Sequence, residues 1–267
     1  MCLSYLGGSR LGFGTVPTAI GMLYFMEMGL VYFVATINGD TNSTLPFITS
    51  AADQRPQSCL FSMCSNLISL FLFVFVFIRH RQCQAFYTVD VFWNVGTMYV
   101  REMILWNNVS RWCGFAGATG WFIVANVQQS GIYYLHTVGA HAAYGGFVFY
   151  MIFQVFFANN ISRAEQRKSA YYFRYFLTAI TIIFFISYVA FEIKVSYYTP
   201  DGSRNYHQAA VAAEWSTVFC QMVFFMSYFT ELEKVKMVYG LNTEYVDIES
   251  VRRIRDYFNH NRGRYRI

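Results

Sequence analysis

The chain has 267 residues, of which 55% are hydrophobic and only 13% are charged, and its formal net charge is +5. A soluble globular domain carries about 25% charged residues, so this composition excludes an ordinary soluble protein. The apolar runs are continuous rather than alternating, which excludes the pattern of a membrane β-barrel. We therefore expect an all-α, polytopic transmembrane bundle.

Six apolar segments have roughly the length, about 17–25 residues, that a helix needs to cross a bilayer. They lie at about 16–37, 59–78, 112–128, 132–157, 175–193 and 207–230. Residues 84–107 mix apolar side chains with Asp90, Arg101 and Glu102, and we interpret them as an interfacial amphipathic helix or a cytosolic segment. The chain then divides into a six-span domain at 1–231 and a basic cytosolic tail at 232–267.

The third predicted span, 112–128, is short and rich in small residues. Gly114, Gly117, Ala118 and Gly120 recur along it at spacings that place them near one another on the helix surface. Small residues allow two membrane helices to approach closely. We therefore expect this span to pack tightly against a neighbour.

The basic residues predict the orientation of the bundle. Only Arg55, Lys194 and Arg204 fall on one side, which leaves 17 of the 20 Lys and Arg residues on the other. Cytosolic segments carry the excess of basic residues, so both termini are predicted to be cytosolic. Asn42 begins an Asn-Ser-Thr sequence in the first luminal loop and is a candidate for glycosylation.

Several motifs occur in an order shared with a known group of membrane proteins. They are residues 35–40, 45–49 and 56–61 around the first loop, Asn66, residues 120–128, His136, Tyr206-His207 and Glu214-Trp215. By these motifs the chain resembles the DRAM-type proteins, whose relatives include the transmembrane-150, Sfk-type and FRAG-like groups. It departs from their pattern by extra residues at 84–107, by its long basic tail, and by lacking an acidic residue after the second proline of the first loop.

The resemblance implies a protein that is not an enzyme and needs no cofactor. DRAM-type proteins modulate autophagy and lysosomal behaviour, whereas Sfk and transmembrane-150 relatives partner a phosphoinositide kinase and affect lipid distribution. We therefore expect a membrane organiser or accessory subunit that engages lipids, anionic ones at the cytosolic face, and a larger protein partner. The expected location is a lysosomal or other endomembrane, or the plasma membrane, and no nucleic acid is expected as a partner.

Polar side chains within or at the edges of the predicted spans are the candidate site residues. They are Glu27, Asn66, Asn126, His136, His141, His207 and Glu214. A charged side chain at the bilayer centre costs at least about 2.5–3.5 kcal/mol, so such groups should face protein or water. One hypothesis is that several meet in a cavity that contacts a lipid headgroup or carries a proton. The other is that they form hydrogen bonds between helices.

Two further functions are considered as alternatives. A small lipid or solute transporter is the first, although the inverted repeats typical of such proteins are not evident. An intramembrane metal-dependent lipid hydrolase is the second, because His207 and Glu214 are seven residues apart on one helix face and His136 could approach them. Zinc enzymes usually supply three protein ligands, and the chain has no HExxH motif.

The basic tail carries its own hypothesis. Its arginines are Arg252, Arg253, Arg255, Arg262, Arg264 and Arg266. Basic residues near an anionic leaflet contribute about 1 kcal/mol each to membrane binding, so the tail could lie on the membrane surface. The alternative is a solvated tail that only follows the orientation rule.

Overall fold

The computed structural model describes residues 12–41, 45–91, 97–165, 168–197, 200–233 and 235. Six long helices dominate these residues: α1 (Thr15–Ile37), α3 (Gln57–Ala85), α5 (Thr97–Asn126), α6 (Tyr133–Glu165), α7 (Lys168–Tyr197) and α8 (Pro200–Met226). Two short helices, α2 (Ile48–Ala51) and α9 (Phe229–Leu232), and a π-helical turn, η1 (Phe86–Val91), complete the described elements. The described ranges contain no strand, and the all-α class is confirmed.

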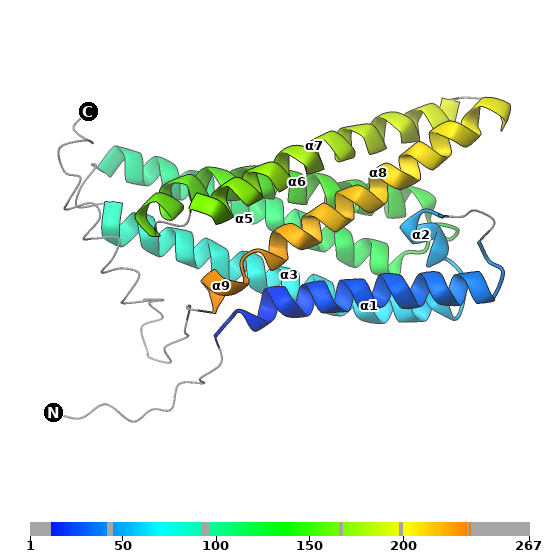
Figure 1. The fold of residues 1–267 in the computed structure, drawn as a ribbon, viewed down its shortest axis with the longest axis horizontal. Helices are drawn as coiled ribbons and strands as arrows, with labels where there is room; N and C mark the ends of the chain where they lie inside the picture. Colours follow the sequence, from blue (N-terminus) through cyan, green and yellow to red (C-terminus); the bar gives the residue numbers. More distant parts are fainter. Residues whose placement is uncertain are drawn as a thin grey trace, which may run out of the picture.

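The six long helices run side by side along one axis, alternating in direction (Figure 1). α2 lies at one end of the bundle and α9 at the other, so we call these the α2 end and the α9 end. The first described residues lie close to the last ones, because a side chain added at Gly12 would meet the backbone of Glu233. The described chain therefore begins and finishes at the α9 end.

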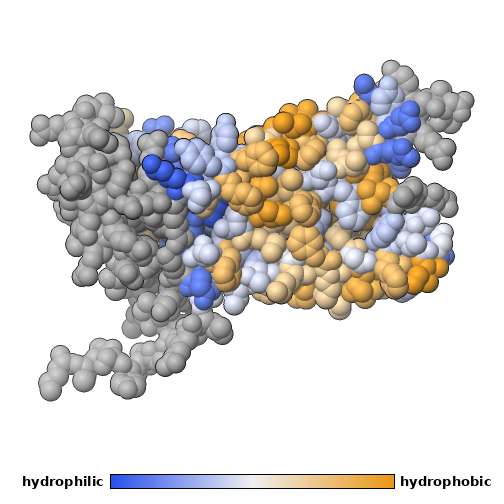
Figure 2. All heavy atoms as spheres, in the orientation of Figure 1, coloured by the Kyte–Doolittle hydropathy of each residue, from blue (hydrophilic) through white to orange (hydrophobic). Residues whose placement is uncertain are grey.

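The protein is an integral, multi-pass membrane protein. Within the described residues, five helical stretches are long and apolar enough to cross a bilayer: Thr15–Ile37, Gln57–Thr88, Tyr133–Asn159, Lys168–Val195 and Asn205–Leu232. Figure 2 shows apolar side chains covering the middle of the visible face, with hydrophilic ones toward the ends. Such a belt fits the hydrocarbon layer of a membrane.

The third long helix begins much earlier than we expected. α5 starts at Thr97 rather than near residue 112. The described residues of the expected interfacial segment at 84–107 therefore belong to the end of α3, η1 and the first turns of α5, and residues 92–96 lie outside the described residues. Val100 and Met103 on α5 are buried in a cluster with Cys83 and Phe157. Burial of these apolar side chains stabilises the early turns as helix although charged residues interrupt the sequence pattern.

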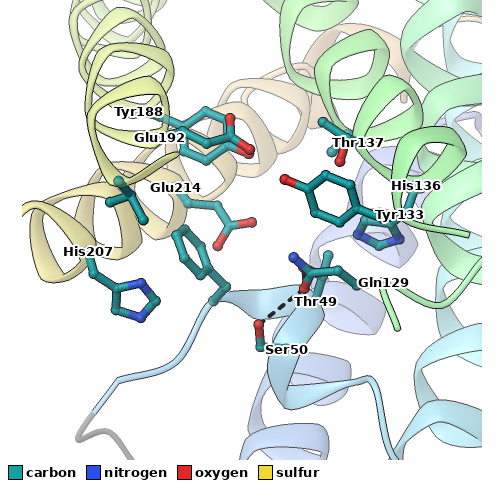
Figure 3. A pocket seen from close by; sticks show the side chains of 13 residues that line it. Thr49, Ser50, Gln129, Tyr133, His136, Thr137, Tyr188, Glu192, His207 and Glu214 are labelled. Atoms are coloured by element: carbon teal, nitrogen blue, oxygen red, sulfur yellow. Dashed lines mark hydrogen bonds between the residues drawn. The ribbon is translucent and has the colours of Figure 1, made fainter. Parts of the chain in front are cut away.

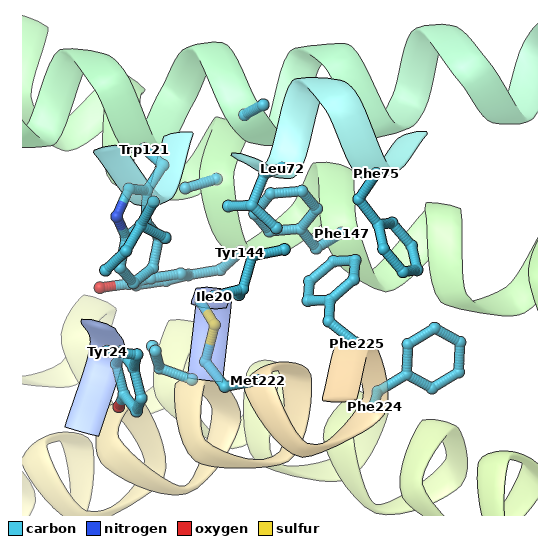
Figure 4. Close-up of a cluster of buried hydrophobic side chains, with 14 of the residues drawn as sticks. Ile20, Tyr24, Leu72, Phe75, Trp121, Tyr144, Phe147, Met222, Phe224 and Phe225 are labelled. Carbon is cyan, nitrogen blue, oxygen red and sulfur yellow. The ribbon is translucent and has the colours of Figure 1, made fainter. Parts of the chain in front are cut away.

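Aromatic rings from several helices meet in the core of the bundle, together with aliphatic side chains (Figure 4). Phe225 on α8 lies edge-on to Phe75 on α3 and to Phe147 on α6, with ring centroids 5.1 Å apart in both pairs. Edge-to-face contacts of this kind add about 0.5–1.5 kcal/mol each beyond the area they bury. They join three helices that are distant in sequence.

α5 and α6 approach each other at glycines, as the small residues of the third span predicted. A Cβ atom on Gly120 would meet the backbone of Ala143 and Gly139, and one on Gly146 would lie 2.7 Å from the backbone nitrogen of Gly117. No larger residue fits at these positions without moving a helix. The prediction of close helix packing is confirmed.

Candidate functional site

A cavity of about 270 Å³ lies at the α2 end of the bundle. The segment around α2, the beginning of α6, the end of α7 and the beginning of α8 surround it (Figure 3). Its charged lining residues are Glu192 and Glu214, and its aromatic ones include Phe47, Tyr133 and Tyr188. The cavity therefore combines carboxylates with aromatic faces.

Glu214 joins three parts of the chain at the wall of this cavity. Its carboxylate accepts a hydrogen bond from the backbone N–H of Ile48 at 3.0 Å and another from the hydroxyl of Tyr144, also at 3.0 Å. Only 2% of Glu214 is exposed. Because Glu214 lies on α8, these two buried hydrogen bonds hold α2 against α6 and α8.

Trp215, the next residue on α8, fixes the loop that precedes α2. Its indole Nε1–H donates to the carbonyl oxygen of Pro46 at 2.8 Å. The ring of Phe47 stands edge-on to His207, with centroids 4.9 Å apart. The first loop is thus folded onto α8. Its segment 45–49 contacts residues that lie more than 150 positions later in the sequence.

His136 lies at the wall of the cavity near Tyr133 (Figure 3). Its Nδ1 is 2.6 Å from the carbonyl oxygen of Val127. A carbonyl can only accept, so Nδ1 carries a hydrogen, and in the neutral ring Nε2 is then an acceptor. Nε2 is buried and has no hydrogen-bond partner among the described residues.

His141 does not line the cavity but contacts a residue that does. Its Nε2 lies 3.2 Å from a carboxylate oxygen of Glu192 on α7. Tyr188, one turn earlier on α7, packs near the rings of both His141 and Tyr144. This arrangement connects α6 to α7 beside the cavity.

A family model described as the Frag1/DRAM/Sfk1/Cwh43P N-terminal domain matches residues 12–235. The chain belongs to this Frag1/DRAM/Sfk1 family. The match covers all the residues that the structure describes, so the described bundle corresponds to the family's domain. The resemblance predicted from the sequence motifs is confirmed.

Curated relatives carry related names. DNA damage-regulated autophagy modulator protein 2 of Rattus norvegicus is 22% identical over 240 residues, covering 85% of this chain and 86% of the relative. Modulator of macroautophagy TMEM150B of Mus musculus is 30% identical over 142 residues, 52% of this chain and 54% of the relative. DNA damage-regulated autophagy modulator protein 1 of Homo sapiens is 22% identical over 211 residues, 77% and 85% of the two chains. No solved structure was found to match.

Within this Frag1/DRAM/Sfk1 domain, the motifs that carried the resemblance contact one another. The first-loop motif supplies Pro46, Phe47 and Ile48, and the α8 motifs supply His207 and Glu214-Trp215, which are their partners. The structure thus brings three of the seven sequence-predicted residues, His136, His207 and Glu214, to one cavity. His141 reaches it through Glu192.

The other three predicted residues lie away from the cavity. Asn66 on α3 and Asn126 on α5 exchange hydrogen bonds through their side-chain amides, at 3.1 and 2.7 Å. Glu27 on α1 accepts a hydrogen bond from Ser65 on α3, and its second carboxylate oxygen has no partner among the described residues. These contacts join helices, as the structural hypothesis for the polar residues requires.

The positions of the described side chains bear on the hypothesis of a metal site. Among these, no group of three or more His, Cys, Asp or Glu residues is placed so that it could hold a metal ion. His136, His207 and Glu214 surround one cavity without forming such a group. Asn42 and the six tail arginines from Arg252 to Arg266 lie outside the described residues.

Sequence reasoning missed a buried charged cluster at the α9 end. Arg79 on α3 and Arg174 on α7 both contact the carboxylate of Glu231 on α9, at 3.5 and 2.8 Å. The ring of Tyr228 lies against both guanidinium groups, with centroid distances of 4.4 and 3.5 Å. Both arginines are among the 17 basic residues predicted to lie on the cytosolic side, and their position at the ends of apolar runs is the only sign of burial in the sequence.

Proposed function

We propose that this chain is a non-enzymatic modulator of autophagy that acts as a membrane organiser or accessory subunit. In this role it engages membrane lipids and a larger protein partner in a lysosomal or other endomembrane. The observation that carries the proposal is the extent of the family match, which includes the complete described bundle from residue 12 to residue 235. The relatives with the longest matches are named autophagy modulators, and none of those described above is named as an enzyme.

The contacts of the polar residues support a scaffold. The Asn66–Asn126 pair and the Glu27–Ser65 hydrogen bond lie between neighbouring helices. Side chains used in this way stabilise one arrangement of helices, at about 0.6–2 kcal/mol per contact. A stable bundle is suited to presenting its surface to lipids and to a partner.

The bundle has six membrane crossings and cytosolic termini in this proposal. α5 has 30 residues, which corresponds to about 45 Å of helix and exceeds the roughly 30 Å of the hydrocarbon layer. It packs between α3 and α6, both of which are candidate spans. The return of the chain to the α9 end supports an even number of crossings, and the basic residues support a cytosolic α9 end.

The basic residues of the α9 end support a preference for anionic lipids. Arg101 and Lys168 are exposed there, whereas Arg79 and Arg174 are buried in the cluster with Glu231 and cannot reach lipid headgroups. Each exposed cation near an anionic leaflet contributes about 1 kcal/mol to the attraction.

Loss of the gene in its host cells, followed by re-expression of the full chain, tests the role. We expect turnover of autophagosome cargo, measured with and without inhibition of lysosomal degradation, to change on loss and to recover on re-expression. Native purification in a mild detergent should recover the chain in a stoichiometric complex larger than the chain itself. A chain that purifies alone, and whose loss leaves cargo turnover unchanged, contradicts the proposal.

A small lipid or solute transporter is the second candidate, and the cavity at the α2 end favours it. Transport requires that the cavity become accessible from the α9 end as well. Reconstitution of the purified chain in liposomes tests this: protein-dependent movement of a lipid or solute between the two sides supports the transporter. Unchanged permeability together with a stoichiometric partner supports the accessory role.

A further inference from the structure

Among the described residues that line the cavity at the α2 end, the lysine, arginine, aspartate and glutamate side chains are all of one sign. Its described lining contains two carboxylates, Glu192 and Glu214, and neither lysine nor arginine. Glu192 is paired with His141. The hydrogen-bond partners of Glu214 among the described residues are a backbone N–H and a tyrosine hydroxyl, both neutral, and a carboxylate can accept about four hydrogen bonds in total. Glu214 thus has room for further donors, and no cation contacts it among the described residues.

A second acceptor is present in the same wall. His136 is 4% exposed, and its Nε2 is without a partner among the described residues. Because Nδ1 donates to the carbonyl of Val127, the neutral ring presents Nε2 as an acceptor. A buried acceptor without a donor destabilises the protein, and a ligand that carries N–H groups would remove that penalty.

The remaining walls suit a positive charge. Phe47, Tyr133 and Tyr188 contribute aromatic faces or edges to the cavity. A cation within about 6 Å of an aromatic face is attracted by the negative potential of the ring. The cavity volume of about 270 Å³ is close to the lower limit of ordinary ligand sites, which selects a small group.

We propose that this cavity binds a primary ammonium group, carried either by a small free amine or by the headgroup of an aminophospholipid. The N–H donors of a primary ammonium match two acceptors from the cavity lining, the carboxylate of Glu214 and Nε2 of His136. A quaternary ammonium has no N–H to donate, and an anion would face two carboxylates. The inference goes beyond the accessory role and does not depend on it.

The experiment uses the purified full chain in nanodiscs and labelled ethanolamine as the probe. We expect saturable binding that excess unlabelled ethanolamine displaces, and that tetramethylammonium and inorganic phosphate at the same concentration do not. Nanodiscs of phosphatidylcholine alone are compared with nanodiscs that also contain phosphatidylethanolamine. Weaker ethanolamine binding in the second set identifies the lipid as the source of the ammonium group, whereas equal binding identifies a free amine.

Glu214→Gln removes the charge while keeping the contacts. The amide oxygen of glutamine can still accept from the N–H of Ile48, and its NH₂ group can donate to the hydroxyl of Tyr144. We expect at least tenfold weaker ethanolamine binding. Ala140→Leu is the second variant: it fills the cavity, which Ala140 lines, without changing a polar group, and should abolish binding even where Glu214→Gln fails to fold.

Glu27→Gln is the matched control, because Glu27 is a buried carboxylate of the same helical bundle that does not line the cavity. Its ethanolamine binding should remain within about twofold of the unaltered chain. The proposal is overturned if the unaltered chain shows no saturable ethanolamine binding, if phosphate binds in its place, or if folded Glu214→Gln binds as the unaltered chain does. These outcomes leave the accessory role unaffected, since co-purification and cargo turnover test that role without an amine.

Discussion

Two arginines and one glutamate are buried together at the α9 end, so the cluster has more positive than negative side chains. Arg79 and Arg174 are 0% and 2% exposed. Among the described residues, Glu231 is the one carboxylate that forms ion pairs with them. Part of the remaining positive charge is met by Gln154, which accepts from Nε of Arg79, and by the face of Tyr228. Burial of charges costs free energy, so the cluster is tolerated only while all its partners are present.

Glu231→Gln should therefore destabilise the protein strongly. Removing one partner of a buried ion pair typically costs about 3–5 kcal/mol, and here two guanidinium groups would lose their carboxylate. We expect a marked fall in the thermal unfolding midpoint of the purified protein. Glu102→Gln removes the same charge from an exposed position at the beginning of α5 and should change the midpoint little. Equal midpoints for the two variants would contradict the role assigned to Glu231.

At the scale of the helices, the α5–α6 pair depends on the absence of side chains. Gly146 on α6 faces the backbone of Gly117 on α5 so closely that a single methyl group would overlap with it. In a membrane, apolar side chains gain little by leaving lipid, so helix association relies on this close packing. The same pair carries His136 on α6, so its spacing also positions a residue of the cavity wall.

Gly146→Ala should weaken this helix pair. Backbone atoms rather than the flexible end of a side chain would meet the new methyl group, and overpacking of this kind costs about 1–3 kcal/mol. Gly29→Ala on α1 is the matched control, because a methyl group there would meet nothing within 4 Å. Alanine favours helix over glycine, so the control should be neutral or slightly stabilising. Thermal unfolding in detergent measures both, and a Gly146→Ala protein as stable as the control would refute close packing.

At the scale of the whole molecule, the topology places different features at the two ends of the bundle. The cavity, α2 and the first loop lie at one end, and the charged cluster with α9 lies at the other (Figure 1). Under the proposed orientation the cavity faces the lumen or the exterior, and the basic residues face the cytosol. A ligand of the cavity and a cytosolic partner would then bind on opposite sides of the membrane.

Epitope tags at the two termini, and a third between residues 128 and 132, test this arrangement. We expect antibody to reach both terminal tags after selective permeabilisation of the plasma membrane, while the internal tag stays protected until the organelle membrane is opened. The connection between α5 and α6 lies at the α2 end, which is why its tag should differ from the others. Terminal tags on opposite sides of the membrane would rule out six crossings.

The sequence by itself determined the membrane class, the family and the set of polar side chains to consider, because hydropathy and short motifs are local properties. It did not determine which of those side chains meet. Ile48 and Glu214 are 166 positions apart, and their contact depends on how α2 and α8 rotate and pack. Asn66 and Glu27 were equal candidates with Glu214 in the sequence, yet only the tertiary structure placed them between helices and away from the cavity.

The burial of the two arginines also could not be predicted from local sequence patterns. Arg79 and Arg174 stand at the ends of apolar runs, where basic residues ordinarily face water at the cytosolic surface. Only the fold of α9 back onto α3 and α7 supplied Glu231 and Tyr228 as their partners. The local sequence pattern indicates that a charged residue lies near the membrane edge. Whether that residue is buried depends on a partner that helix packing brings from elsewhere in the chain.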